Sequence, residues 1–159
     1  MSFKAILDVG GKTFDLLYCS SEVFQKTDSS GRPVSGVHAG YIWFVIEGTD
    51  DDTFSSWASD PTKKQDGTVT FYRIDQDSTF KKIEFKGAYL NILIESFIVD
   101  EDISDPMRWG YLVSDLKLLE EIYELIKDIQ VHSNTSYAIF FRLSAEKVKI
   151  DGVDHDNKW

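Results

Sequence analysis

The sequence is poor in the residues that build disulfides and metal centres. Its 159 residues include one cysteine, Cys19, and three histidines, His38, His132 and His155. A single cysteine excludes an intramolecular disulfide, so a reducing compartment fits best, with Cys19 as a small apolar residue of a strand. No histidine has a partner at metal-ligand spacing. We therefore expect no metal site and no cofactor.

Long apolar runs and an excess of positive charge are also missing. No apolar run approaches the ~20 residues of a membrane span. The N-terminal stretch MSFKAILDVGG lacks the basic region and apolar run of a signal peptide. Lysine and arginine number 17 against 27 acidic residues, a net charge of −10. This balance disfavours nucleic acid and anionic membranes as partners, and we expect a cytoplasmic protein.

Catalytic motifs are absent as well. Asp154-His155-Asp156 resembles a base with an orienting carboxylate, but no GxSxG nucleophile accompanies it, so a surface tail is expected. Asp100-Glu101-Asp102 with Asp105 lacks the glycine and final glutamate of a calcium loop, which favours a solvated loop. The sequence therefore predicts no catalytic residues and no enzyme.

Alternating strands are what the sequence mainly contains. Hydrophobic residues make up 42% and aromatic residues 14%, enough for a core. A glycine turn at residues 10–12 predicts an N-terminal hairpin, and a polar tail follows residue 150. The expected strand regions are 2–9, 13–24, 38–48, 68–75, 80–85, 88–97 and 137–150.

Two segments have helical spacing instead. In residues 49–60, Thr49 or Asp50 is the expected N-cap, and Phe54 and Trp57 share one face. From Ser114 to about Val131, apolar residues occupy one half of a helical wheel and charged residues the other. This second helix must bury its apolar face. The residues expected on that packing face are Leu116, Leu119, Ile122, Tyr123, Ile126 and Ile129.

Three ordered motifs resemble one known family. They are TDSSGRPVSGV at residues 27–37, KQDGTVTFYRID at residues 64–75, and a C-terminal pattern of His155, Asn157 and Trp159. Together they resemble the tube protein of type VI secretion systems, the haemolysin-coregulated protein Hcp, in its Bacteroidetes-type form. The likeness covers residues 1–107 and 137–159.

The resemblance implies a single domain over residues 1–159, a mainly β fold with a small β-barrel of two packed sheets and one short helix. It also implies six-membered rings that stack into a hollow tube, and no chemistry. The partners implied are copies of the chain itself, with sheath, spike and effector proteins of the secretion system. Export would occur through that apparatus, without a signal peptide.

The same resemblance gives residues 25–40 a role as an exposed loop that docks one ring on the next. Pro33 would hold the loop open, and Gly31 and Gly36 would supply unusual backbone dihedrals. Arg32 would offer its planar fork to carboxylates or carbonyls of the adjacent subunit. The residues assigned to this interface are Thr27, Asp28, Gly31, Arg32, Pro33, Ser35, Gly36 and Val37.

The sequence departs from the family at residues 108–136, where the amphipathic helix reads as an insertion. An alternative alignment begins the last strand at Arg108 and interrupts it later. The strand 89–97 is apolar on both sides, so we expect the helix to cover it near residues 90–94, with Trp43 and Phe44 as further contacts.

Two other functions stay open from the residues alone. The chain could be a specialised tube paralogue whose rings do not stack. It could also be a monomeric β-barrel that binds a small apolar ligand or an effector, with the helix as a lid. The number of subunits in solution separates these possibilities.

Overall fold

The computed structural model describes residues 2–98 and 117–157. Strands dominate, as the alternation of apolar and polar residues predicted. The elements are β1 (Phe3–Val9), β2 (Lys12–Thr27), β3 (Pro33–Glu47), α1 (Thr53–Ser59), β4 (Gln65–Arg73), β5 (Ser78–Phe97), α3 (Lys117–Ser133), β6 (Tyr137–Ser144), β7 (Lys147–Ile150) and β8 (Val153–Asp156).

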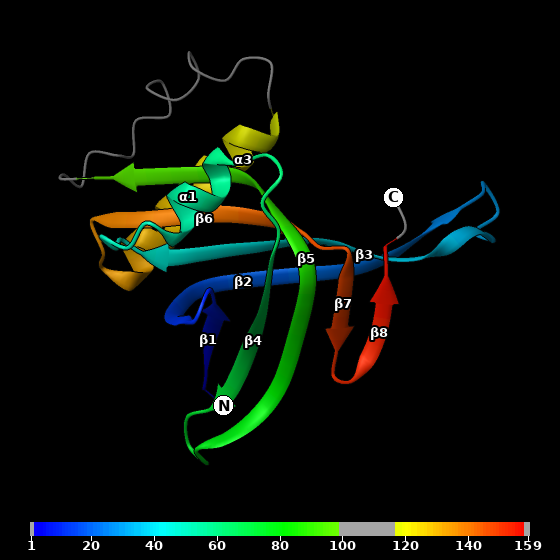
Figure 1. Ribbon diagram of the computed structural model, residues 1–159, viewed down its shortest axis with the longest axis horizontal. Helices are drawn as coiled ribbons and strands as arrows, with labels where there is room; N and C mark the ends of the chain where they lie inside the picture. The colour runs from blue at the N-terminus through cyan, green and yellow to red at the C-terminus, as the bar shows by residue number, and fades with distance from the viewer. Residues whose placement is uncertain (1, 99–116, 158–159) are drawn as a thin grey trace.

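All the strands belong to one antiparallel sheet (Figure 1). Its order is β4-β1-β2-β3-β6-β5-β7-β8, and β4 also pairs with β5. Six strands therefore form a closed hydrogen-bonded circuit, and the β7–β8 hairpin extends from β5. The family's two packed sheets appear here as one continuous sheet, because the long β5 pairs with β4 along its first half and with β6 along its second.

Strand β5 differs in two ways from its sequence prediction. The expected break at Lys86-Gly87 is wrong, since one strand of 20 residues runs through it. Gly87 adopts φ +60°, and its N–H donates to Asp66 Oδ1 at 2.9 Å. A register shift between Leu90 and Ile92 makes Asn91 an extra residue. Such a bulge reverses which face the following side chains occupy.

The bulge divides β5 between two apolar clusters on opposite faces of the sheet. Leu90 and Leu93 join the inner cluster, which the closed circuit surrounds. Ile92 and Ile94 join an outer cluster beneath α3. The expected contacts of the helix with Leu90 and Phe44 are therefore wrong, because both side chains belong to the inner cluster, whereas Trp43 contacts the outer one.

Helix α1 packs its aromatic residues into the inner cluster. Phe54 and Trp57 are 2% and 0% exposed, and Trp57 Nε1 donates to the carbonyl of Ala88 at 3.1 Å. The helix starts later than expected, with Asp52 as N-cap and no side-chain cap bond. Asp51 fixes the first turn instead, because its carboxylate accepts the Thr53 N–H at 2.8 Å and pairs with Lys12 Nζ at 2.6 Å.

Helix α3 lies against β6 and β2 on the outer face. Ile122 and Ile126 are each 1% exposed in the outer cluster, and Ile129 is partly buried beside them. Tyr123 is half-buried. Leu116 and the side chain of Leu119 lie outside the described part of the chain. In the region 108–136, where an inserted helix was expected, the structure describes residues 117–136, and α3 lies within them.

A buried glutamine that sequence reasoning missed fastens the end of α3. The side chain of Gln130 is 4% exposed. Its Oε1 accepts the Ser96 hydroxyl at 3.1 Å, and its Nε2 donates to the carbonyls of Ser96 and Ser136, both at 3.2 Å. These bonds join the helix to β5 and to the chain entering β6. The amphipathic pattern gave a weak signal for this role, since Gln130 is a polar residue on the apolar side of the wheel.

Candidate assembly surfaces

The segment expected to be a long loop is mostly strand. Strands β2 and β3 continue past the closed circuit as a hairpin, paired as far as Thr27 and Pro33. In Figure 1 this hairpin projects beyond the rest of the molecule. Residues 21–34 are all exposed. The connection itself comprises only residues 28–32, so the projecting element is held by backbone hydrogen bonds along its length.

Asp28 organises the hairpin tip. Its Oδ1 accepts hydrogen bonds from Ser30 Oγ at 2.7 Å, Ser30 N at 2.9 Å and Arg32 N at 3.0 Å. The Ser30 hydroxyl and then the backbone donors lower the pKa of Asp28. Gly31 adopts φ +86°, a conformation that favours glycine. The tip is therefore an ordered turn, held by hydrogen bonds to Asp28, with residue 32 at its end.

Arg32 lies at this tip with its side chain in solvent. Its guanidinium makes no hydrogen bond or ion pair within residues 2–98 and 117–157. Two apolar side chains further along β3 are also exposed, Val34 by 61% and Val37 by 47%. A hairpin that exposes a planar donor fork and two valines is a suitable surface for a protein partner.

The stem of the hairpin is pinned by Ser35. The Ser35 hydroxyl accepts the Lys26 N–H at 3.0 Å, and Gln25 Nε2 donates to the Ser35 carbonyl at 3.0 Å. Gly36 is not in the left-handed region, so the expectation of an unusual dihedral there is wrong. A Cβ at residue 36 would meet no atom within 4 Å. Its small size leaves the strand surface open.

Asn157 fixes the base of the hairpin. It is 6% exposed, and its side-chain amide hydrogen-bonds to both backbone groups of Ala39 and to the carbonyl of Ala145. The sequence marked Asn157 as part of the terminal pattern, but its partners lie far away in the chain. The asparagine therefore joins the C-terminal segment to β3 where the hairpin leaves the sheet.

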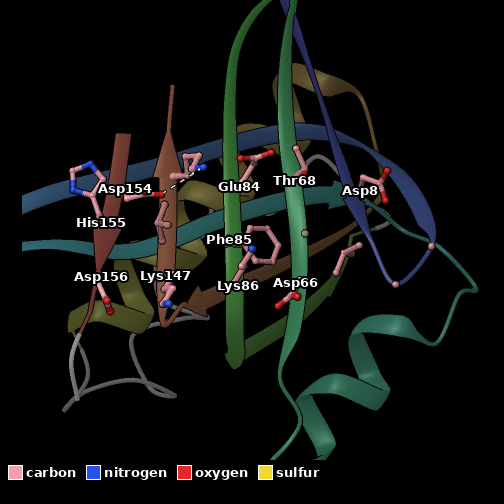
Figure 2. Close-up of a pocket in the computed structure, with 16 residues that line it drawn as sticks. Asp8, Asp66, Thr68, Glu84, Phe85, Lys86, Lys147, Asp154, His155 and Asp156 are labelled. Atoms are coloured by element: carbon pink, nitrogen blue, oxygen red, sulfur yellow. Dashed lines mark ion pairs between the residues drawn. The ribbon is translucent and has the colours of Figure 1, made fainter. Parts of the chain in front are cut away.

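A polar groove of about 840 Å³ lies across β1, β4, β5, β7 and β8 (Figure 2). Lys149 on β7 and the opposite residue Asp154 on β8 form an ion pair in its lining at 3.7 Å. The charged side chains in this lining are Asp8, Asp66, Glu84, Lys86, Lys147, Lys149, Asp154 and Asp156.

The groove contains the Asp154-His155-Asp156 triplet, which was expected in a surface tail. That expectation is wrong, because residues 153–156 form β8 and pair with β7. Backbone pairing orders this stretch despite its polar side chains. No metal-binding group of histidine, cysteine, aspartate or glutamate occurs in the two described ranges. The acidic stretch at residues 100–105 lies outside them.

The comparisons with known proteins agree with this fold. The sequence model of the family "Hemolysin coregulated protein Hcp (TssD)" matches residues 1–118. The chain belongs to the Hcp family. Hcp proteins are structural tube proteins of type VI secretion, so the mainly β, Hcp-like fold and the structural role expected from the sequence are confirmed.

Solved structures show the same fold over nearly the whole chain. Hcp1 from Flavobacterium johnsoniae is 25% identical with a TM-score of 0.70, covering 97% of this chain and 99% of that chain. A further Hcp protein is 9% identical with a TM-score of 0.65, covering 99% and 98%. Hcp1 from Salmonella typhimurium is 12% identical with a TM-score of 0.61, covering 94% and 86%.

No curated protein matches this chain. Among the described residues, no helix has both the length and the apolar character needed to cross a bilayer.

Proposed function

We propose that this Hcp chain forms homo-hexameric rings that stack into the inner tube of a type VI secretion system. The proposed role is structural and involves no reaction. Copies of the chain itself are the main partners, and sheath, spike and effector proteins of the secretion system are the others. The chain would leave the cytoplasm as part of that apparatus.

The observation that supports stacking most directly is the projecting β2–β3 hairpin. Its stem is paired, its tip is ordered by Asp28, and its exposed Arg32 has no partner in the described chain. A preorganised element loses little conformational entropy when it binds. We propose that Arg32 donates hydrogen bonds to carboxylates or carbonyls of the adjacent ring, while Val34 and Val37 add apolar contact.

Segment 108–136 is proposed as an addition to the ring-forming core. The family match ends at residue 118, close to the start of α3. The helix packs on an apolar face that the closed circuit of strands would otherwise leave exposed. It therefore changes one surface of the subunit without interrupting the sheet.

The test compares the wild-type protein with Arg32→Ala by light scattering and negative-stain imaging. We expect wild type to form rings of six subunits and short tubes, and Arg32→Ala to form rings with fewer tubes. Lys82→Ala is the matched control, because Lys82 pairs with Glu84 at 3.5 Å within the chain and lies away from the hairpin.

Each other outcome has a definite meaning. Wild-type protein that stays single-copy at high concentration contradicts the tube function and favours a monomeric binding protein. Rings that never stack indicate a specialised paralogue. Equal tube formation by wild type and Arg32→Ala contradicts the docking role of the hairpin tip.

A further inference from the structure

The three described arginines differ from the lysines in their partners. Five lysines form ion pairs within the chain, whereas Arg32, Arg73 and Arg142 form none among the described residues. This is unexpected in a chain with 27 acidic residues. Arginine is also the cation whose planar fork suits pairing across interfaces.

Arg142, on β6, is the most rigidly held of the three. Its guanidinium lies over the ring of Tyr41 at 3.8 Å from the centroid and near that of Trp43 at 5.7 Å. Its Nε donates to Asn91 Oδ1 at 2.8 Å, and Asn91 in turn donates to Ser144 Oγ at 3.3 Å. The bulge in β5 supplies this asparagine.

This arrangement leaves one edge of the guanidinium for an outside ligand. Stacking occupies its face and Asn91 occupies Nε, so the two terminal nitrogens remain. Together they fit a carboxylate end-on in a charge-assisted pair. A hollow of about 320 Å³ opens beside Tyr41. Glu22 lines that hollow but forms no ion pair with Arg142 among the described residues.

The same face of the sheet carries a row of unpaired carboxylates on α3. Trp43 contacts both Arg142 and the outer cluster under α3, which places the arginine and the helix on one face. Opposite its buried side, α3 exposes four acidic residues, and none forms an ion pair in the described chain. They are Glu120, Glu121, Glu124 and Asp128.

We propose that Arg142 of one copy binds a carboxylate on the outer side of α3 of the neighbouring copy in a ring. Rotation about a ring axis places the outer sheet faces of all copies on the same side of the ring. Arg142 of one copy and α3 of the next copy can therefore approach each other. The inference rests on the proposed ring. Each contact would also offset part of the repulsion between subunits of charge −10.

The experiment measures the protein concentration at which half of the full-length chain is assembled, by light scattering. For Arg142→Ala we expect that concentration to rise by about tenfold or more, and for Arg142→Lys to rise by less. Arg142→Lys keeps the charge and the aliphatic stem, so it guards against a variant that merely fails to fold. Lys82→Ala is again the control for lost charge.

A charge exchange identifies the partner. Arg142→Glu should weaken assembly, and adding Glu124→Arg should restore it at least partly. Asp75→Arg, in the exposed turn after β4, gives the same net charge and should not restore it. Equal rescue by both changes, or normal assembly of Arg142→Ala, overturns the inference while leaving the ring intact. Single-copy wild type would instead overturn the proposed function.

Discussion

The side-chain amide of Asn157 pairs with the backbone of Ala39 as a neighbouring strand would. Ala39 N–H donates to Asn157 Oδ1 at 3.0 Å, and Asn157 Nδ2 donates to the Ala39 carbonyl at 2.9 Å, across 118 residues of sequence. The strand β3 leaves the closed circuit at this point. A single side chain therefore anchors the base of the projecting hairpin to the C-terminal segment.

Asn157→Ala should destabilise the protein by about 2–4 kcal/mol, because buried backbone groups of Ala39 and Ala145 lose their partners. Asn157→Asp should cost at least as much, since it loses both donated bonds and buries a charge. Urea unfolding measures the difference. Gln76→Ala, in an exposed turn, should stay within about 0.5 kcal/mol. Similar values for Asn157→Ala and Gln76→Ala would contradict this prediction.

Ile126→Ala should lower the free energy of unfolding by about 2–4 kcal/mol, because it leaves a cavity between α3 and the sheet. Val131→Ala in the same helix provides the control, since Val131 is 65% exposed and should contribute little. Both are measured by chemical unfolding. If the two substitutions cost the same, the helix does not pack on the outer cluster in solution.

Acid should remove the contribution of the Asp51–Lys12 pair to the stability of the folded protein. The Lys12 hydrogen bond and then those of Thr53 lower the pKa of Asp51 from 3.8 to about 2. A lowered folded-state pKa adds stability above pH 3.8 that is lost as the pH falls towards 2. The stability difference between wild type and Asp51→Asn should therefore shrink across that range. A constant difference from pH 5 to pH 2 would show that ionisation of Asp51 adds nothing to the stability of the fold.

Cys19 should react slowly with alkylating reagents in the folded protein. Burial raises the pKa of its thiol to about 12. The reactive thiolate at pH 8 should then be on the order of 1,000-fold scarcer than in a free cysteine. Timed alkylation followed by mass spectrometry measures the rate, with urea-unfolded protein as the reference. Equal rates in the folded and unfolded protein would rule out the buried position.

The sequence predicted the elements that have a clear apolar pattern. Helix α3 is apolar on one side, and the buried parts of β3 and β6 are continuous apolar runs because both of their faces are covered. The hairpin stem and β8 have no such pattern, because their side chains are exposed or polar on both sides, and backbone pairing alone makes them strands. Residues 25–40 were therefore expected to be a loop. Their role at an interface was proposed separately, from the family resemblance.

A periodic pattern of apolar residues could not predict features that depend on one residue. The extra residue at Asn91 moves Leu90 and Ile92 to opposite faces, and nothing in the alternation indicates where a bulge falls. The sequence pattern could not predict the Arg142 site either, because that site joins residues of three strands. Only the three-dimensional pairing brings Tyr41, Asn91 and Arg142 together.

The closed circuit of strands also has a consequence for how the chain folds. Ile42 pairs with Leu143, and β1 pairs with β4, so much of the sheet joins residues far apart in sequence. Such non-local topologies fold in milliseconds to seconds. Until β6 arrives, the long edges of β3 and β5 stay open to other molecules. A chain in which this closure is incomplete should therefore aggregate more readily than the finished subunit.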